Sequence, residues 1–365
     1  MEFAWPSDIE AVRLEAEDVA LKGAAGREIL EDSWINGHDR AFSAELGRRG
    51  WWGMTWPTEY GGGGRSALER FVVFEAMIAN GAPIAATWFC DRQMGPSLLA
   101  FGTEEQRRRF LPDMLAGTAA WCIGMSEPDS GSDLASLRTR AVREGDEFVV
   151  NGAKVWTSFA ALADWCYLIC RTDPDARAHE GLSEMIVDMK SPGVTVRPIM
   201  DMTGISHFCE VIFEDVRVPV GNLVGELNGS WKQTMSQLEH ERGGIDRLLS
   251  NRALYRDSLG RADLSDPLIR QAVGAAEGFY RIGRLLVLRE VMGQAPRGFS
   301  AATKTACTLF EQRVAELCVR IWGAEAMLWN RASRGACYAP AYTIQGGTDA
   351  ILHNVIGERV LGLPR

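Results

Sequence analysis

The apolar positions along the chain follow a helical pattern, then a β-rich pattern, and then a helical pattern again. In the first part, apolar residues recur at a spacing that is typical of helices with one buried face. Ser7 followed by Glu10 predicts a capping box at the start of the first helix. The helices predicted in this part cover residues 7–21, 68–79 and 103–115, the last with Thr103 as N-cap.

Near Trp121 the pattern changes to short runs that are rich in β-branched and aromatic residues. Clusters of Gly, Pro and Asp separate these runs, as expected for strands joined by turns. Strands do not alternate with helices here, which argues against a Rossmann fold. The pattern predicts a compact β-barrel or sandwich. Its predicted strands are residues 148–152, 154–157, 165–171, 184–189, 194–197 and 208–213.

Helical periodicity returns after Gly225 and persists almost to the end of the chain. Helices on both sides of a strand-rich middle indicate an α+β fold. The predicted C-terminal helices are residues 229–258, 267–293, 300–328 and 349–360.

Composition and charge exclude several classes of function. The 365 residues carry a formal net charge of −9, and no basic stripe is present to neutralise phosphates, so we expect no nucleic-acid binding. We expect no membrane span, because the sequence lacks a run of about 18 consecutive apolar residues. We also expect no secretory signal, because the first six residues are acidic and lack an apolar region.

The cysteines and histidines do not have the spacing of metal ligands. The eight cysteines form no C-x-x-C pair, and the five histidines show no H-x-x-x-H pattern, so we expect no metal site. Cys166 and Cys170 lie in an apolar run and are expected to pack as small hydrophobic side chains. Unpaired thiols fit the reducing cytoplasm.

Two segments near the start of the β-rich part combine hydroxyl groups with a ring or a glycine. Residues 126–133 (SEPDSGSD) offer hydroxyl and main-chain donors to a polar ligand, although the same residues also fit an ordinary acidic turn. Trp156, Thr157 and Ser158 offer an aromatic face and two hydroxyls to a flat ring system. The alternative for these three is a buried tryptophan beside surface hydroxyls.

Glu241 is the candidate general base. A helix beginning near Trp231 would place Glu241 and Arg242 at the two edges of an apolar stripe, formed by Trp231, Met235, Leu238, Ile245 and Leu249. A desolvated carboxylate has a raised pKa, which suits the removal of a weakly acidic C–H proton. The following Gly243 and Gly244 indicate close approach of a ligand or a helix break. The alternative is a Glu–Arg salt bridge on the helix edge.

Residues 345–349 (QGGTD) precede the last predicted helix. Glycines before a helix that Thr348 caps form a site for a partly negative oxygen, although a plain turn between helices has the same residues. The order of these glycines matches neither the dinucleotide-binding nor the Walker motif.

Taken in order, these segments resemble the acyl-CoA dehydrogenase family, and the resemblance runs from about residue 8 to residue 365. It implies an acyl-CoA dehydrogenase-like α+β fold with an N-terminal helical domain (1–120), a middle β-barrel domain (121–226) and a C-terminal four-helix bundle (227–365). In this family FAD lies between the last two domains. The matching segments are residues 56–62, 102–106, 110–112, 126–133, 154–158, 215–219, 241–242 and 347–348.

The resemblance also assigns roles to individual residues. Ser132 and Arg242 would bind the CoA substrate, and Trp156 and Ser158 would flank the isoalloxazine ring. The cofactor-binding residues it implies are Met125, Ser126, Ser132, Trp156, Thr157, Ser158, Gly347 and Thr348.

The resemblance further implies the position of the catalytic base. Most members of the family carry a glutamate in the last loop, where this chain has Gly346. A minority carry it in a Glu-Arg pair after the β-domain, which Glu241 and Arg242 match. We therefore predict that Glu241 removes the α-proton, while the Gly346 N–H polarises the thioester carbonyl. The expected product is a trans-2-enoyl-CoA, and an electron-transfer flavoprotein would re-oxidise the FAD.

Two departures from the family pattern concern assembly. Residues 252–260 keep no copy of the family's arginine–x–x–phenylalanine–glycine segment, and Arg320 replaces a glutamine in residues 320–326. This resembles subunits of α2β2 heterotetramers that act on steroid side chains or other bulky CoA esters, and a homodimer or homotetramer is the alternative. Two other functions stay open, a non-catalytic partner subunit and a flavin monooxygenase or oxidase. Phe74, Trp88 and Phe89 are candidate residues of the acyl pocket.

Overall fold

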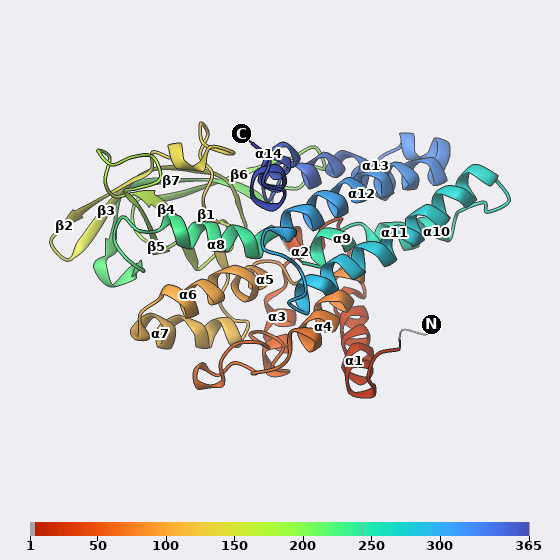
Figure 1. Cartoon of the computed structure of the whole chain (residues 1–365), viewed down its shortest axis with the longest axis horizontal. Helices are drawn as coiled ribbons and strands as arrows, with labels where there is room; N and C mark the ends of the chain where they lie inside the picture. Colours follow the sequence, from red (N-terminus) through yellow and green to blue (C-terminus); the bar gives the residue numbers. More distant parts are fainter. Residues whose placement is uncertain (1–3, 243, 365) are drawn as a thin grey trace. The chain divides into compact units, whose positions relative to one another are not determined.

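The computed structural model describes residues 4–242 and 244–364, and for residues 239–242 it describes the backbone only (Figure 1). The chain forms two compact units, each built from separate chain segments. We call Met1–Gly37, Arg65–Ile84 and Glu239–Arg365 the helical unit, and His38–Gly64 and Ala85–Leu238 the sheet unit. The predicted combination of helices and sheet is confirmed, whereas the domain boundaries at 120 and 226 stay a prediction.

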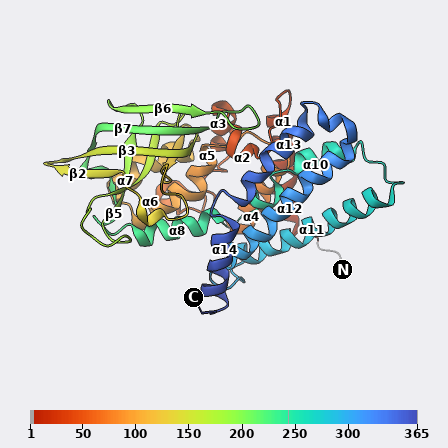
Figure 2. The same ribbon diagram turned by 90° about the horizontal axis from the view of Figure 1, so that it is seen from above.

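One mixed sheet organises the sheet unit. Its strand order is β6-β7-β3-β2-β4-β5-β8, and Figure 2 shows β6, β7, β3 and β2 in this order. Strand β1 pairs with β4 in parallel. Strands β3 and β7 are long and pair antiparallel with each other. The shorter strands β6 and β2 pair with β7 and β3, respectively. The strands are β1 (Trp121–Gly124), β2 (Arg140–Glu144), β3 (Glu147–Ser158), β4 (Trp165–Arg171), β5 (Leu182–Asp188), β6 (Val194–Ile199), β7 (Phe208–Pro219) and β8 (Leu223–Val224).

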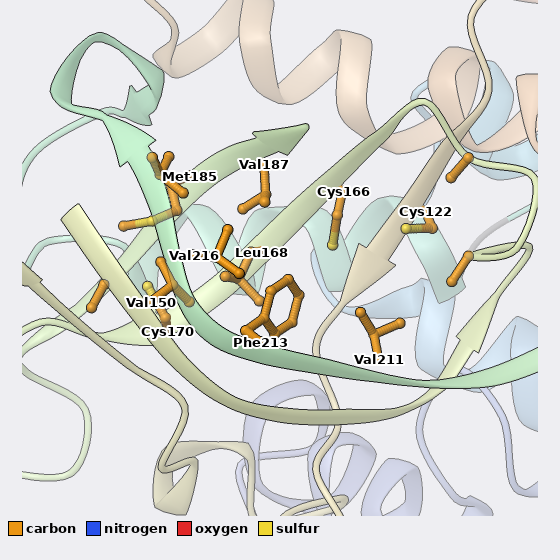
Figure 3. Close-up of a cluster of buried hydrophobic side chains, with 14 of the residues drawn as sticks. Cys122, Val150, Cys166, Leu168, Cys170, Met185, Val187, Val211, Phe213 and Val216 are labelled. Atoms are coloured by element: carbon orange, nitrogen blue, oxygen red, sulfur yellow. The ribbon is translucent and has the colours of Figure 1, made fainter. Parts of the chain in front are cut away.

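The inward-facing side chains of these strands form one apolar core (Figure 3). Along β7, Cys209, Val211 and Phe213 are buried, as the two-residue period of a strand requires. Cys166 and Cys170 on β4 are fully buried in the same cluster. The prediction that these two cysteines pack as small hydrophobic side chains is therefore confirmed.

Strand β3 differs from its prediction because it is continuous. Two separate runs were expected around Gly152, but the chain keeps its pairing with β7 across this glycine. The register shifts between Val150 and Gly152 and again between Lys154 and Thr157, so the strand absorbs both irregularities as β-bulges. Gly152 has φ +148°, which a glycine adopts without strain.

Some of the N-terminal helices begin at a residue whose side chain caps them, and others do not. Thr103 and Gln106 form a capping box before α7, which confirms the predicted N-cap. The capping box predicted at Ser7 is wrong, because Pro6 occupies the N-cap and no side chain caps α1. The helices of this part are α1 (Ser7–Ala24), α2 (Ser33–Asn36), α3 (Arg40–Arg48), α4 (Ala67–Ala79), α5 (Thr87–Phe89), α6 (Gly95–Phe101) and α7 (Glu104–Leu115).

The C-terminal helices are shorter than the periodicity predicts. The single helix expected over residues 229–258 is interrupted near Gly244, whose φ of +132° no helix accommodates. The helix expected over 300–328 ends at Trp322, because Gly323 takes φ +57°. Helices α11 and α12 run side by side (Figure 2). The elements are α8 (Trp231–Arg242), α9 (Asp246–Leu249), α10 (Arg252–Leu259), α11 (Pro267–Val291), α12 (Phe299–Trp322), α13 (Arg331–Tyr338) and α14 (Asp349–Val355).

Helix α8 buries a polar face in the sheet unit, not the apolar stripe that was predicted. Gln233, Thr234 and Gln237 are buried, and Trp231, Met235 and Leu238 of the expected stripe are only half-buried. The physical reason is a buried carboxylate on β5: Thr234 donates to Glu184 Oε1 at 2.7 Å, and Gln233 donates to Oε2 at 3.0 Å.

No helix in the described part of the chain is both long enough and apolar enough to cross a membrane.

Candidate functional site

Trp156 is a large aromatic side chain held in an exposed and strained position. It lies in the second bulge of β3 with φ +60°, a conformation that bulky residues rarely adopt. Its side chain is 57% exposed, and the ring meets the edge of Phe208 with 5.9 Å between centroids. The alternative of a buried tryptophan is therefore wrong. Strain of this kind costs about 1–3 kcal/mol and concentrates at functional positions.

The neighbouring hydroxyl of Thr157 is a buried polar atom that no described residue satisfies. Its Oγ1 is shielded from solvent and has no hydrogen-bond partner within the described part of the chain. Leaving a buried hydroxyl unpaired is unfavourable, so this atom is suited to bind a ligand group. Ser158, the last residue of β3, is half-buried.

The segment that contains Met125 and Ser126 is fixed against the same strand. The Ser126 carbonyl accepts a hydrogen bond from the Val155 N–H at 2.9 Å. The buried Lys154 ammonium donates to the Met125 carbonyl at 3.0 Å. The structure therefore brings Met125 and Ser126 next to residues 154–158, and their roles in binding the cofactor stay predictions.

Lys154 also forms a buried ion pair with Glu127. Lys154 Nζ donates to Glu127 Oε1 at 2.8 Å, and the carboxylate accepts the main-chain N–H groups of Arg138 and Thr139. Burial would raise the pKa of Glu127, but the Lys154 charge and these hydrogen bonds outweigh it and lower that pKa. Burial lowers the pKa of Lys154. The pair fixes the turn that starts the 126–133 segment.

Ser132 lies farther along that segment and is exposed. Glu127 and Ser130 pair through their main chains in a tight turn, so the acidic-turn description of this segment is correct for its first half. The binding role of Ser132 stays a prediction.

The glycine loop before α14 is held in the helical unit. Gly346 and Gly347 have φ values of +67° and +91°, which only glycine adopts at low cost. The completely buried Lys304 donates to the Gly347 carbonyl at 3.0 Å. The predicted cap is confirmed, because the Thr348 hydroxyl accepts from the Ile351 N–H.

The candidate base lies in the last turn of α8. The helix includes Glu241 and Arg242 up to its final residue, but both side chains lie outside the described residues. Their predicted roles as base and substrate ligand therefore stay predictions. The candidate pocket residues Phe74, Trp88 and Phe89 are all buried.

Three family models together match most of the chain. The acyl-CoA dehydrogenase N-terminal domain matches residues 8–118, the middle domain matches residues 122–216, and the C-terminal domain matches residues 228–361. The chain belongs to the acyl-CoA dehydrogenase family. The predicted family, its fold and the enzyme class are thereby confirmed.

Individual acyl-CoA dehydrogenases match the chain over nearly its full length. IpdE1 of Mycobacterium tuberculosis (strain ATCC 25618 / H37Rv) is 36% identical, and the alignment covers 99% of this chain and 96% of the relative. FadE26 of the same organism is 33% identical over 88% of this chain and 87% of its own length.

Two solved structures share the fold closely. The Tcur3481-Tcur3483 steroid ACAD has a TM-score of 0.91 and 32% identity, with 100% of each chain covered. The ChsE4-ChsE5 complex from Mycobacterium tuberculosis has a TM-score of 0.87 and 31% identity, also over 100% of each chain.

Lys154 and Lys304 hold main-chain carbonyls of the candidate segments, and sequence reasoning did not assign them this role. Each is a lysine inside an apolar or small-residue run, and each is completely buried. Buried lysines are rare unless they are paired. A lysine at an inward position of a predicted strand or helix is the signal that would have identified them.

Proposed function

We propose that this chain catalyses the FAD-dependent α,β-dehydrogenation of an acyl-CoA thioester to the trans-2-enoyl-CoA. The observation that carries the proposal is the exposed Trp156, strained at a bulge beside the unpaired Thr157 hydroxyl. An aromatic face and an unsatisfied donor at one position suit a flat heterocycle with polar edge atoms.

The residues of the sheet unit fit an isoalloxazine ring. Trp156 offers the stacking face, and Thr157 and Ser158 offer hydroxyl donors. Met125 and Ser126 are fixed beside them by the hydrogen bonds to Lys154 and Val155. We assign Gly347 and Thr348 as further FAD ligands, and Ser132 as a ligand of FAD or the substrate. When bound, FAD accepts the hydride that leaves the β-carbon.

Glu241 is assigned as the base that removes the α-proton, with Arg242 beside it as a substrate ligand. Position 346 is a glycine, so it supplies no carboxylate where most members of the family carry the glutamate, and its N–H is assigned to the thioester carbonyl. A hydrogen bond to that oxygen stabilises the negative charge that develops as the α-proton leaves.

Replacing Glu241 by Gln tests the assignment of the base. We expect kcat to fall by about 10²–10⁴-fold, the usual contribution of a general base, with FAD content unchanged. Dye-linked acyl-CoA oxidation measures the effect, and absorption spectra report the bound flavin. Glu239→Gln makes the same chemical change two residues earlier and is expected to retain activity. A Glu241→Gln enzyme with near-normal kcat rules the assignment out.

We propose a bulky, steroid-derived acyl-CoA as the substrate class. The support is the likeness to a structure described as a steroid ACAD, at 32% identity over the full chain. Anaerobic mixing with short, branched, long and steroidal acyl-CoAs tests this, because oxidation of the thioester bleaches the visible absorption of the flavin. Bleaching by the steroidal thioester is expected. Bleaching only by short chains contradicts the substrate class, and no bleaching by any thioester contradicts the proposed reaction.

We further propose that the enzyme works with a second subunit and with an electron-transfer flavoprotein, in the cytoplasm. Its described cysteines are free thiols, which suits a reducing compartment. Next to the altered 320–326 segment, Met327, Leu328 and Trp329 are exposed in succession, Met327 by 87%. An apolar run of this kind is typical of a covered interface. Native mass spectrometry after co-expression with a homologous subunit measures the stoichiometry.

The specific alternative is a non-catalytic partner subunit, which the altered interface segments favour. A purified chain that binds no flavin, alone or with its partner, supports this alternative. A flavin monooxygenase or oxidase is distinguished by comparing aerobic with anaerobic turnover.

A further inference from the structure

Asp32 is a completely buried carboxylate far from the predicted catalytic segments in the sequence. It precedes α2 in the left-handed conformation, with φ +61°. Aspartate is rarely buried unless its oxygens are hydrogen-bonded, because removing a carboxylate from water is costly. Its burial and its strained backbone both require a structural reason.

Three side chains from distant parts of the helical unit donate to this carboxylate. Ser250 Oγ lies 2.5 Å from Oδ1, and Tyr338 Oη lies 2.9 Å from Oδ2. Gln345 Nε2 donates to the same Oδ2, also at 2.9 Å. Burial raises the pKa of Asp32, although these hydrogen bonds and the nearby Arg247 charge act in the opposite direction.

Of these donors, only Gln345 belongs to the glycine loop. The next two residues are Gly346 and Gly347, which have no side chain with which to anchor their own positive-φ backbone. The loop is held at its far end by Lys304, which binds the Gly347 carbonyl. At its near end the corresponding side-chain anchor is the bond from Gln345 to Asp32.

We infer that Asp32 is a positioning residue, which through Gln345 fixes the loop that presents the Gly346 N–H to the thioester carbonyl. The part that concerns the thioester rests on the proposed function. A hydrogen bond from a main-chain N–H requires the donor within a few tenths of an ångström of its best place, so a loosened loop weakens it.

A matched pair of variants tests this inference. Gln345→Met and Tyr338→Phe each remove one hydrogen bond of 2.9 Å to the same oxygen of Asp32. Only the first frees the loop. Both keep the size of the side chain, and both keep the buried aspartate, so folding is expected to survive.

The first measurement is hydrogen exchange of the amides of residues 344 and 345, which donate to the Ala341 carbonyl at the start of the loop, in the flavin-loaded protein without substrate. We expect about tenfold faster exchange in Gln345→Met and less than a twofold change in Tyr338→Phe. Equal exchange in the two variants overturns the positioning role, whatever reaction the enzyme catalyses.

The second measurement is the affinity for two non-oxidisable probes. One is an acyl-CoA blocked at Cα by two methyl groups, and the other is the matching S-alkyl-CoA, which lacks the carbonyl oxygen. We expect Gln345→Met to reduce the preference for the thioester about tenfold, and Tyr338→Phe to leave it unchanged. An unchanged preference in Gln345→Met overturns the inference. No preference in the unaltered enzyme instead overturns the thioester contact of the proposed function.

Discussion

Trp156 and Thr157 show how a single bulge prepares two neighbouring side chains for a ligand. The bulge turns the tryptophan outward at φ +60° and leaves the threonine hydroxyl inside without a described partner. Neither feature stabilises the free protein. A bound flat ligand would cover the ring and pair the hydroxyl, which offsets the cost of the unpaired donor, although the backbone strain would remain. These residues therefore favour the ligand-bound state.

The Lys154–Glu127 pair is expected to couple strongly in stability measurements. Lys154→Met leaves a buried carboxylate without its cation, which costs about 3–5 kcal/mol. Adding Glu127→Gln removes that charge, so the double variant is expected to be more stable than the Lys154→Met single variant. Urea unfolding of the four proteins measures the coupling. Additive free energies would contradict the ionic description of the pair.

His207 predicts a pH dependence of stability. Burial lowers the pKa of His207 to about 4, and Asp201, 3.9 Å away, opposes the shift only in part. Its pKa in the unfolded chain is about 6.5. Between these values the unfolded state binds more protons, so stability falls as the pH decreases from about 6.5 towards 4.

The size of this effect is at most about 3 kcal/mol, from the 1.36 kcal/mol that corresponds to one pKa unit. The His207→Gln variant isolates it, because all other titrating groups are shared with the unaltered protein. We expect the free energy of unfolding of this variant to fall less between pH 6.5 and pH 4. A parallel decline in both proteins would exclude His207 as the cause.

Among helices and strands, the break between α8 and α9 depends on Gly244. A Cβ at this position would lie 2.4 Å from Asp246 Oδ1, and φ +132° is unfavourable for any other residue. Gly244→Ala is expected to destabilise the protein by about 1–3 kcal/mol.

In the exposed middle of α11, Gly274 has free space around its Cα, so Gly274→Ala is expected to stabilise the protein by about 0.5–1 kcal/mol. Thermal unfolding of both variants checks the opposite signs.

The elements that sequence reasoning predicted well are those whose periodicity directly reflects burial. Strands β4 and β5 lie close to their predicted positions because their apolar residues face the core, whereas β7 begins as predicted but continues to Pro219, past the predicted end at residue 213. Strand β2 (RAVRE) was missed because it is mostly exposed and is held by its pairing with β3. Helix α13 was missed because it is short and carries polar residues.

The candidate site was predictable only in part. The residues that we propose as ligand-binding groups, such as Trp156 and Thr348, lie in local motifs that a sequence displays. The residues that hold these groups in place do not. Asp32 accepts a hydrogen bond from Gln345, which lies 313 positions away in the sequence. The polar face of α8 is buried because it donates hydrogen bonds to Glu184 on strand β5. No local pattern encodes a partner that folding alone brings into contact.

Within the complete chain, the helical unit combines segments from both ends of the sequence, so we expect these segments to unfold together. Glu31 binds Arg331 at 3.0 Å and Arg334 at 2.9 Å, so α13 packs against residues near the N-terminus. We expect amides of α2 and α13 to exchange through one cooperative opening, with the same free energy. Native-state hydrogen exchange in low denaturant measures this. Two clearly different free energies would show that the segments open independently.

The hydrogen bond between Asp32 and Tyr338 has a consequence for biosynthesis, because 306 positions separate these residues. At about 5–20 residues per second, the ribosome releases Tyr338 roughly 15–60 s after Asp32. During that interval α1 can pack on α4, but the C-terminal helices that complete this unit are still missing. The apolar residues that the C-terminal helices later cover therefore stay exposed on the nascent chain until translation reaches these helices.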